Sequence, residues 1–265
     1  MTRRVEGWTT PVSAIMRSSD DVQYPSGRTE PTDLVVVGTR TRRLLDAAPI
    51  VMALGVLVGL LVPATRNLTF AIAGRGERKP VELLTFLFLL AGGILGVELA
   101  RRARRAGAEA IVWGFFALFA FGLLWTGIEE IAWGQTLLGY RTPELMHSIN
   151  AQDEMTLHNV YGLQGHSEWF RLAFGLGGLV GLALVRSRRY RAVATPRLLV
   201  PWLLVIVVSS AIDELNDRVS LGGTLDFAIN TLSETVEMLI GMAGFLYVWV
   251  HFTRWSAADR TGPAV

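Results

Sequence analysis

Three groups of carboxylates stand at or near the ends of long apolar segments in this 265-residue chain. Glu129 and Glu130 end one segment, Asp213 and Glu214 end another, and Glu237 lies within a third. Carboxylates held together away from water repel one another unless a proton or a cation offsets their charge. Such groups can act as general acids and bases or as oxygen ligands of a divalent cation. The sequence therefore predicts that these side chains converge on a functional site.

An imidazole can complete this site. Glu154 precedes His158 by four residues, which would place both side chains on one face of a helix. Oxygen ligands alone favour Mg²⁺, Ca²⁺ or Mn²⁺, and an added imidazole admits Zn²⁺ or iron. The chain has no cysteine, so thiolate ligands and a cysteine nucleophile are excluded. The predicted catalytic residues are Glu129, Glu130, His158 and Glu237, and the predicted ligands of a divalent cation are Glu130, Glu154, His158, Asp213, Glu214 and Glu237.

The composition places this site in a membrane protein. Hydrophobic residues make up 51% of the chain and charged residues 18%, and the mean hydropathy is +0.39. Soluble domains usually carry about 25% charged residues. The net charge of +2 comes without a basic stripe interleaved with aromatic residues, so nucleic-acid binding is not expected. We expect an integral, multi-pass protein of the cell membrane.

Uncharged runs predict an all-α, polytopic bundle of about six transmembrane helices, because about 20 apolar residues cross the hydrocarbon core. Three later runs are shorter than a full span, so they must draw flanking charged residues toward the membrane boundary. The predicted helices are 47–65, 81–100, 110–128, 168–187, 197–217 and 232–253. The predicted domains are a disordered cytoplasmic tail (1–43), a six-helix transmembrane domain (44–254) and a short cytoplasmic tail (255–265).

The arginine distribution predicts the orientation of the bundle. The tails and the connections 101–105 and 186–197 carry 18 arginines, whereas the opposite side carries six arginines and Lys79. Positive residues accumulate in cytoplasmic loops, so both termini are expected in the cytoplasm. The carboxylate groups then lie at the outer boundary. We expect Glu130, Glu214 and Glu237 to meet in one cavity that opens outward, because isolated carboxylates are costly in lipid.

The segment 129–159 is dense in hydrogen-bonding side chains. It contains Glu-Glu-Ile-Ala-Trp-Gly-Gln, then Thr-Pro-Glu, Asn-Ala-Gln and Leu-His-Asn. In this order the motifs resemble those of a family of uncharacterised bacterial multi-pass membrane proteins, over about an eighth of the chain. The resemblance implies a shared site on the outer face and no particular reaction.

Three functions remain open on the sequence. The leading hypothesis is a membrane-embedded hydrolase or transferase, with or without a metal, that acts on a lipid or lipid-linked substrate. Its carboxylates would bind a cation or supply acid and base, His158 would shuttle protons, and Trp133 and Trp169 would line the lipid entrance. The alternatives are a small proton- or ion-coupled transporter and a structural protein without catalysis. No particular oligomeric state is predicted.

Overall fold

The computed structural model describes residues 38–74, 79–150, 155–157, 160–161, 167–187 and 189–261. These residues are largely helical and include no β-strand. Six helical segments are long and apolar enough to cross a membrane, which confirms the predicted all-α, polytopic bundle. They are Thr39–Leu61, Pro80–Arg105, Ala110–Glu130, Glu168–Arg186, Arg191–Val219 and Gly223–Ser256. The protein is therefore an integral membrane protein.

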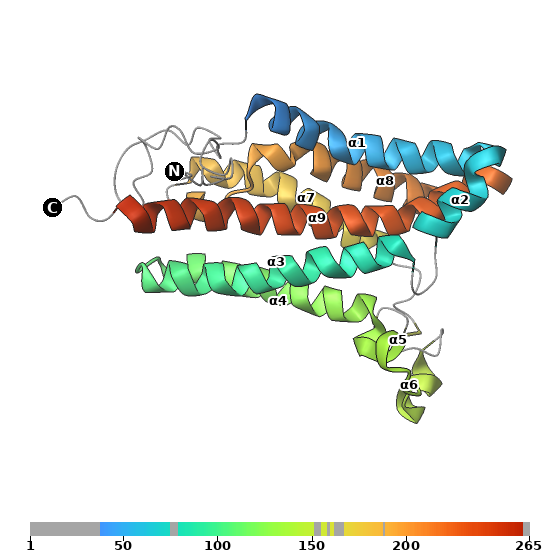
Figure 1. The fold of residues 1–265 in the computed structure, drawn as a ribbon, viewed down its shortest axis with the longest axis horizontal. Coiled ribbons are helices and arrows are strands. Elements are labelled where there is room, and N and C mark those ends of the chain that lie inside the picture. The colour runs from blue at the N-terminus through green and yellow to red at the C-terminus, as the bar shows by residue number, and fades with distance from the viewer. Residues whose placement is uncertain are drawn as a thin grey trace, which may run out of the picture.

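Short helices join the long ones, mostly at one end of the bundle (Figure 1). The α-helices are α1 (Thr39–Leu61), α2 (Pro63–Ala73), α3 (Pro80–Arg105), α4 (Ala110–Glu130), α5 (Gln135–Leu138), α6 (Glu144–Ile149), α7 (Ser167–Gly181), α8 (Val200–Val219) and α9 (Gly223–Thr261). The 3-10 turns are Ala132–Gly134, Leu182–Arg186, Arg191–Val193 and Arg197–Leu199.

The long helix α9 forms the centre of the bundle. It packs against α3 and α8, and also against α1. Small residues permit this packing, since a Cβ added at Gly92 of α3 would lie 3.1 Å from the Cα of Phe245. A Cβ added at Gly241 of α9 would lie 3.3 Å from the carbonyl oxygen of Thr85. The backbones of α3 and α9 therefore approach each other closely.

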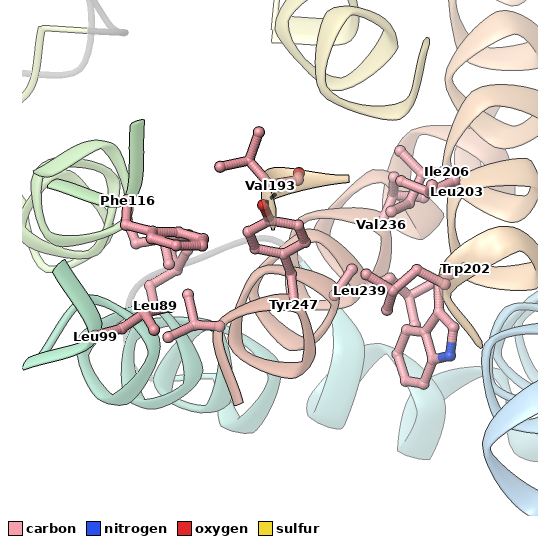
Figure 2. Packing of buried hydrophobic residues seen from close by; sticks show 14 of the residues in the cluster. Leu89, Leu99, Phe116, Val193, Trp202, Leu203, Ile206, Val236, Leu239 and Tyr247 are labelled. Carbon is pink, nitrogen blue, oxygen red and sulfur yellow. Dashed lines mark hydrogen bonds between the residues drawn. The ribbon is translucent and has the colours of Figure 1, made fainter. Parts of the chain in front are cut away.

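Buried polar groups tie α9 to the connection between α7 and α8. The Tyr247 hydroxyl donates to the Val193 carbonyl at 2.7 Å, and Figure 2 shows the two residues together. One turn further along α9, Nε2 of His251 lies 3.2 Å from the Ala194 carbonyl oxygen. These contacts satisfy backbone carbonyls that would otherwise be costly to bury in a membrane.

Three of the helix boundaries in the structure differ from the sequence-based prediction. The first span ends at Leu61, because Val62 is extended and Pro63 starts the separate helix α2. Proline is well tolerated at the first position of a helix, where its missing N–H needs no partner. The helix α1 also begins at Thr39, within the predicted tail 1–43, whose first 37 residues lie outside the described ones. At the other end, α9 continues to Thr261, beyond the predicted boundary at residue 254.

The helix directions agree with an even number of crossings. The start of α1 and the end of α9 lie at one end of the bundle, at the left in Figure 1. The helices α2, α5 and α6 and the turn between α8 and α9 lie at the other end, which we call the predicted outer end.

A labelling experiment tests the orientation. Ala106 and Leu145 are exposed at opposite ends of the bundle. The chain has no cysteine, so a cysteine introduced at either position is its only thiol. We expect Leu145→Cys to react with an impermeant maleimide in intact cells, and Ala106→Cys to react only after the membrane is opened. The same response from both variants would contradict the predicted topology.

Candidate functional site

Five carboxylates from three helices form an acidic cluster at the predicted outer end: Glu82, Glu129, Glu130, Glu234 and Glu237. Glu130, the last residue of α4, experiences electrostatic repulsion from the other four. Glu129 is buried and the other four are partly buried. Because α3 packs against both α4 and α9, the outer ends of these helices come together. Such repulsion favours a bound proton or a bound cation within the acidic cluster.

A buried arginine connects this cluster to the other half of the bundle. Arg171, in the first turns of α7, is only 4% exposed. Its Nη1 donates to Oε1 of Glu237 at 3.0 Å, and its Nη2 donates to Oδ2 of Asp213 on α8 at 2.5 Å. One guanidinium group thus bridges α7, α8 and α9 and holds Glu237 in one orientation.

Glu214 does not take part in this bridge. It forms an ion pair with Arg218, one turn along α8, and its Oε1 accepts from Nε of Arg218 at 2.6 Å. Successive residues of an α-helix point about 100° apart, so Asp213 and Glu214 cannot both face Arg171. Of the three residues that we expected in one cavity, Glu130 and Glu237 come together, whereas Asp213 takes the position expected for Glu214.

Glu129 anchors the loop that follows α4. Its Oε1 accepts from Nε1 of Trp133 at 2.6 Å, and its Oε2 accepts from the backbone N–H of Leu157 at 2.7 Å. The chain turns sharply just after α4, with φ angles of 46° at Ala132, 56° at Trp133 and 87° at Gly134. Left-handed backbone is costly for residues other than glycine, so the bond between Trp133 and Glu129 helps to maintain this turn.

Other residues of the motifs in segment 129–159 form hydrogen bonds within the same loop. Nε2 of Gln135 donates to Oγ1 of Thr142 at 2.8 Å, and Oε1 of Gln135 accepts from the backbone N–H of Met155 at 2.8 Å. Nδ2 of the buried Asn150 donates to the carbonyl of Thr156 at 2.7 Å. Gln135, Thr142 and Asn150 therefore stabilise the fold of the loop that follows α4.

We predict that Glu129→Gln loosens this loop. A glutamine offers one acceptor oxygen, so Trp133 and Leu157 could not both keep their present bonds. The expected cost is about 1–3 kcal/mol, the usual penalty for a buried polar group without a partner. Hydrogen exchange of the amides in 131–157 should rise in Glu129→Gln and stay unchanged in Glu144→Gln, whose carboxylate is exposed on the same loop. Equal exchange in both variants would contradict the anchoring role.

The predicted metal ligands divide into four sets. Glu130 belongs to the acidic cluster. Glu154 and His158 lie outside the described residues. Asp213 and Glu237 share Arg171, and Glu214 pairs with Arg218. Within the described part of the chain, no group of three or more His, Asp or Glu side chains is arranged to hold a metal ion.

Arg171 was not among the site residues predicted from the sequence. A signal was present, because Glu168 and Arg171 are three residues apart at the start of a short apolar run. A span with so few apolar residues must draw these charges to the membrane boundary, where they need partners. Both residues are buried in the structure, with 4% of each side chain exposed.

Comparison of the chain with protein-family models, with curated protein sequences and with solved structures finds no match.

Proposed function

We propose that this protein is a membrane-embedded hydrolase or transferase of the cell membrane, acting at the outer leaflet on a lipid or lipid-linked substrate. The observation that carries the proposal is the electrostatic repulsion of Glu130 by four other carboxylates, one of which, Glu237, is oriented by a buried arginine. A structural membrane protein has little reason to gather so much like charge at the boundary of the hydrocarbon.

The two central carboxylates suit acid and base catalysis. Glu237 is held by Arg171, so its carboxylate keeps a fixed direction, which favours proton transfer at a defined atom of the substrate. Glu130, repelled by its neighbours, is the group that gains most from carrying a proton or facing a cation. We assign the proton-transfer roles of the proposed reaction to Glu130 and Glu237, with Glu129 as a positioning residue.

Aromatic side chains beside the acidic cluster support a lipid substrate. Trp133, which donates to Glu129, packs against Trp125 with ring centroids 5.1 Å apart. Trp169 and Phe170 precede Arg171 and are 52% and 68% exposed. Tryptophan is enriched at the level of the lipid headgroups. These side chains offer a lipid chain a path to the carboxylates from two sides of the bundle.

The inner half of α9 favours an enzyme over a transporter. A carrier must expose its titrating groups alternately to both sides of the membrane. Tyr247 and His251, the buried polar residues of this half, instead hold the backbone carbonyls of Val193 and Ala194. They fasten the connection between α7 and α8 to α9, which supports a site open to one side.

The outer loop supplies the remaining parts of the proposal. The resemblance to the multi-pass family includes His158 in a shared outer-face site, and Glu154 precedes His158 by four residues. We assign His158 the role of proton shuttle, and Glu154 and His158 would bind a divalent cation together with the acidic cluster.

The function is tested by lipid mass spectrometry of membranes with and without the protein, with and without a chelator. A substrate lipid should accumulate without the protein, and unchanged lipids would contradict the proposal.

A further inference from the structure

The last turns of α3 concentrate positive charge at the predicted inner end of the bundle, where α1 begins and α9 ends. Four of the five residues in 101–105 are arginines: Arg101, Arg102, Arg104 and Arg105. Arginines near the end of a helix offset the partial negative charge of its last carbonyl groups. That role needs charge but no defined direction of the side chain, so a fixed direction indicates a further role.

Arg102 is held in one direction by contacts on two helices. Its Nε donates to Oε1 of Glu98, one turn back along α3, at 3.0 Å, and its Nη1 donates to Oγ of Ser256 on α9 at 2.8 Å. The guanidinium carbon lies 4.4 Å from the centroid of the Phe252 ring. Figure 1 shows the ends of α3 and α9 side by side at the left. The two hydrogen bonds do not use Nη2, so Arg102 can donate to a ligand from a fixed position.

Arg102 lines a recess at the end of α3. The other lining residues are Glu98, Arg105 and Ala106, and the volume of the recess is about 290 Å³. Glu98, Arg102 and Arg105 are spaced by four and three residues, so they share one face of the helix. Ligand pockets usually measure about 300–1,000 Å³, so this recess suits a ligand of the size of a lipid headgroup.

The recess carries a net positive charge. Two guanidinium groups line it together with one carboxylate, and that carboxylate pairs with Arg102. One positive charge is left for a ligand, which matches the single negative charge of a phosphodiester. The planar guanidinium group suits phosphate oxygens, to which it can donate two parallel hydrogen bonds.

The position of the recess along α3 favours a lipid as the source of the phosphate. Residues 83–97 of this membrane-spanning helix are uncharged, and Glu98 and the arginines follow them directly. The first charged turn after an apolar span lies at the level of the lipid headgroups. Basic pockets on the cytoplasmic side of membrane helices bind anionic headgroups.

We propose that this recess binds the phosphate of an anionic phospholipid of the inner leaflet, with Arg102 and Arg105 as its donors. The site lies at the opposite end of the bundle from the acidic cluster, so the inference goes beyond the proposed function and does not depend on it. Because Arg102 is bonded to Ser256, the bound lipid contacts the side chain that joins α3 to α9.

Native mass spectrometry of the purified protein tests the site. The protein in micelles is titrated with phosphatidylglycerol and with phosphatidylcholine of the same chains. We expect the first phosphatidylglycerol to bind about fivefold or more tightly than phosphatidylcholine. Arg105→Gln should lower the affinity for phosphatidylglycerol about tenfold and leave that for phosphatidylcholine unchanged, because a charge-assisted hydrogen bond is lost. Equal binding of both lipids by the unaltered protein overturns the proposal.

Arg104→Gln is the matched control. It removes the same charge from the same turn of α3, but the Arg104 guanidinium carbon lies 5.3 Å from the centroid of the Trp113 ring on α4, and Arg104 does not line the recess. The affinity of Arg104→Gln for phosphatidylglycerol should stay within about twofold, since a charge without direct contact acts through a screened field. Equal losses in Arg104→Gln and Arg105→Gln would mean that general positive charge attracts the lipid, and the site would be refuted.

Glu98→Gln tests the site in the opposite direction. A glutamine Oε1 can still accept from Nε of Arg102, but the negative charge at the recess is gone. The affinity for phosphatidylglycerol should therefore rise about fivefold. A misfolded variant would not bind the lipid more tightly, so a rise supports the recess, and an unchanged or lower affinity contradicts it.

Competition distinguishes a lipid from a soluble phosphate. Glycerol 3-phosphate at the concentration of the lipid should leave phosphatidylglycerol bound, because the acyl chains add apolar contact with the helices. Displacement of the lipid by glycerol 3-phosphate would assign the recess to a soluble anion and overturn the lipid assignment.

Discussion

Replacing Glu130 by glutamine is expected to lower lipid turnover by about 100-fold or more, the usual contribution of a general acid or base. The substitution keeps the volume and the hydrogen-bonding capacity of the side chain but removes its ability to ionise and to transfer a proton. It also removes repulsion from four neighbouring carboxylates, so the melting temperature should stay the same or rise. Lost activity in a protein of undiminished stability is the signature of a functional carboxylate.

The chain provides a matched control for this variant. Glu214 lies at the same end of the bundle and pairs with Arg218 outside the acidic cluster. Glu214→Gln should therefore retain turnover, although the sequence alone assigned Glu214 a ligand role. The measurement is the conversion of lipid by purified protein in nanodiscs, followed by mass spectrometry, together with thermal melting. Full turnover in Glu130→Gln, or equal losses in both variants, would contradict the assignment of the site.

Most of the fold could be predicted from the sequence, because membrane spans are encoded by local composition. The run that ends at Ile128 is apolar for almost the full thickness of a bilayer, and α4 covers this run. The division of the first predicted helix at Pro63 was less visible, because both sides of the proline are apolar. The helix α9 (Gly223–Thr261) extends beyond the predicted helix 232–253 at both ends. These extensions depend on tertiary packing, which composition does not report.

The site could be predicted only in part. Helical periodicity placed Glu129, Glu130 and Glu237 near one boundary, and the structure brings Glu130 and Glu237 together. Helical periodicity could not show whether Asp213 or Glu214 faces Arg171, because that depends on the rotation of α8 against α7 and α9. It also gave no partner to Arg171, since the bridge joins residues that are 42 and 66 positions away in the chain. Contacts across helices depend on the depth and rotation of each helix, which one sequence does not specify.

Replacing Arg171 by methionine is expected to destabilise the bundle by about 3–5 kcal/mol, the range measured when one partner of a buried ion pair is removed. Methionine fills much of the same volume, so the loss reports charge more than packing. Asp213 would keep a carboxylate that is 6% exposed without its guanidinium, and Glu237 would lose the bond that orients it. The free energy of unfolding, measured by denaturant titration in micelles, should fall accordingly.

The reason for this loss predicts its remedy. The triple variant Arg171→Met, Asp213→Asn, Glu237→Gln leaves no uncompensated charge where Arg171 meets Asp213 and Glu237. Most of the stability should therefore return, while turnover stays low. Arg218→Met is the control, because Arg218 pairs with Glu214 through a side chain that is 65% exposed, and such pairs contribute about 0–1 kcal/mol. If Arg171→Met costs no more than Arg218→Met, the bridge does not hold α7, α8 and α9 together. If the triple variant is as unstable as Arg171→Met alone, the guanidinium acts through packing, and the orientation of Glu237 needs another cause.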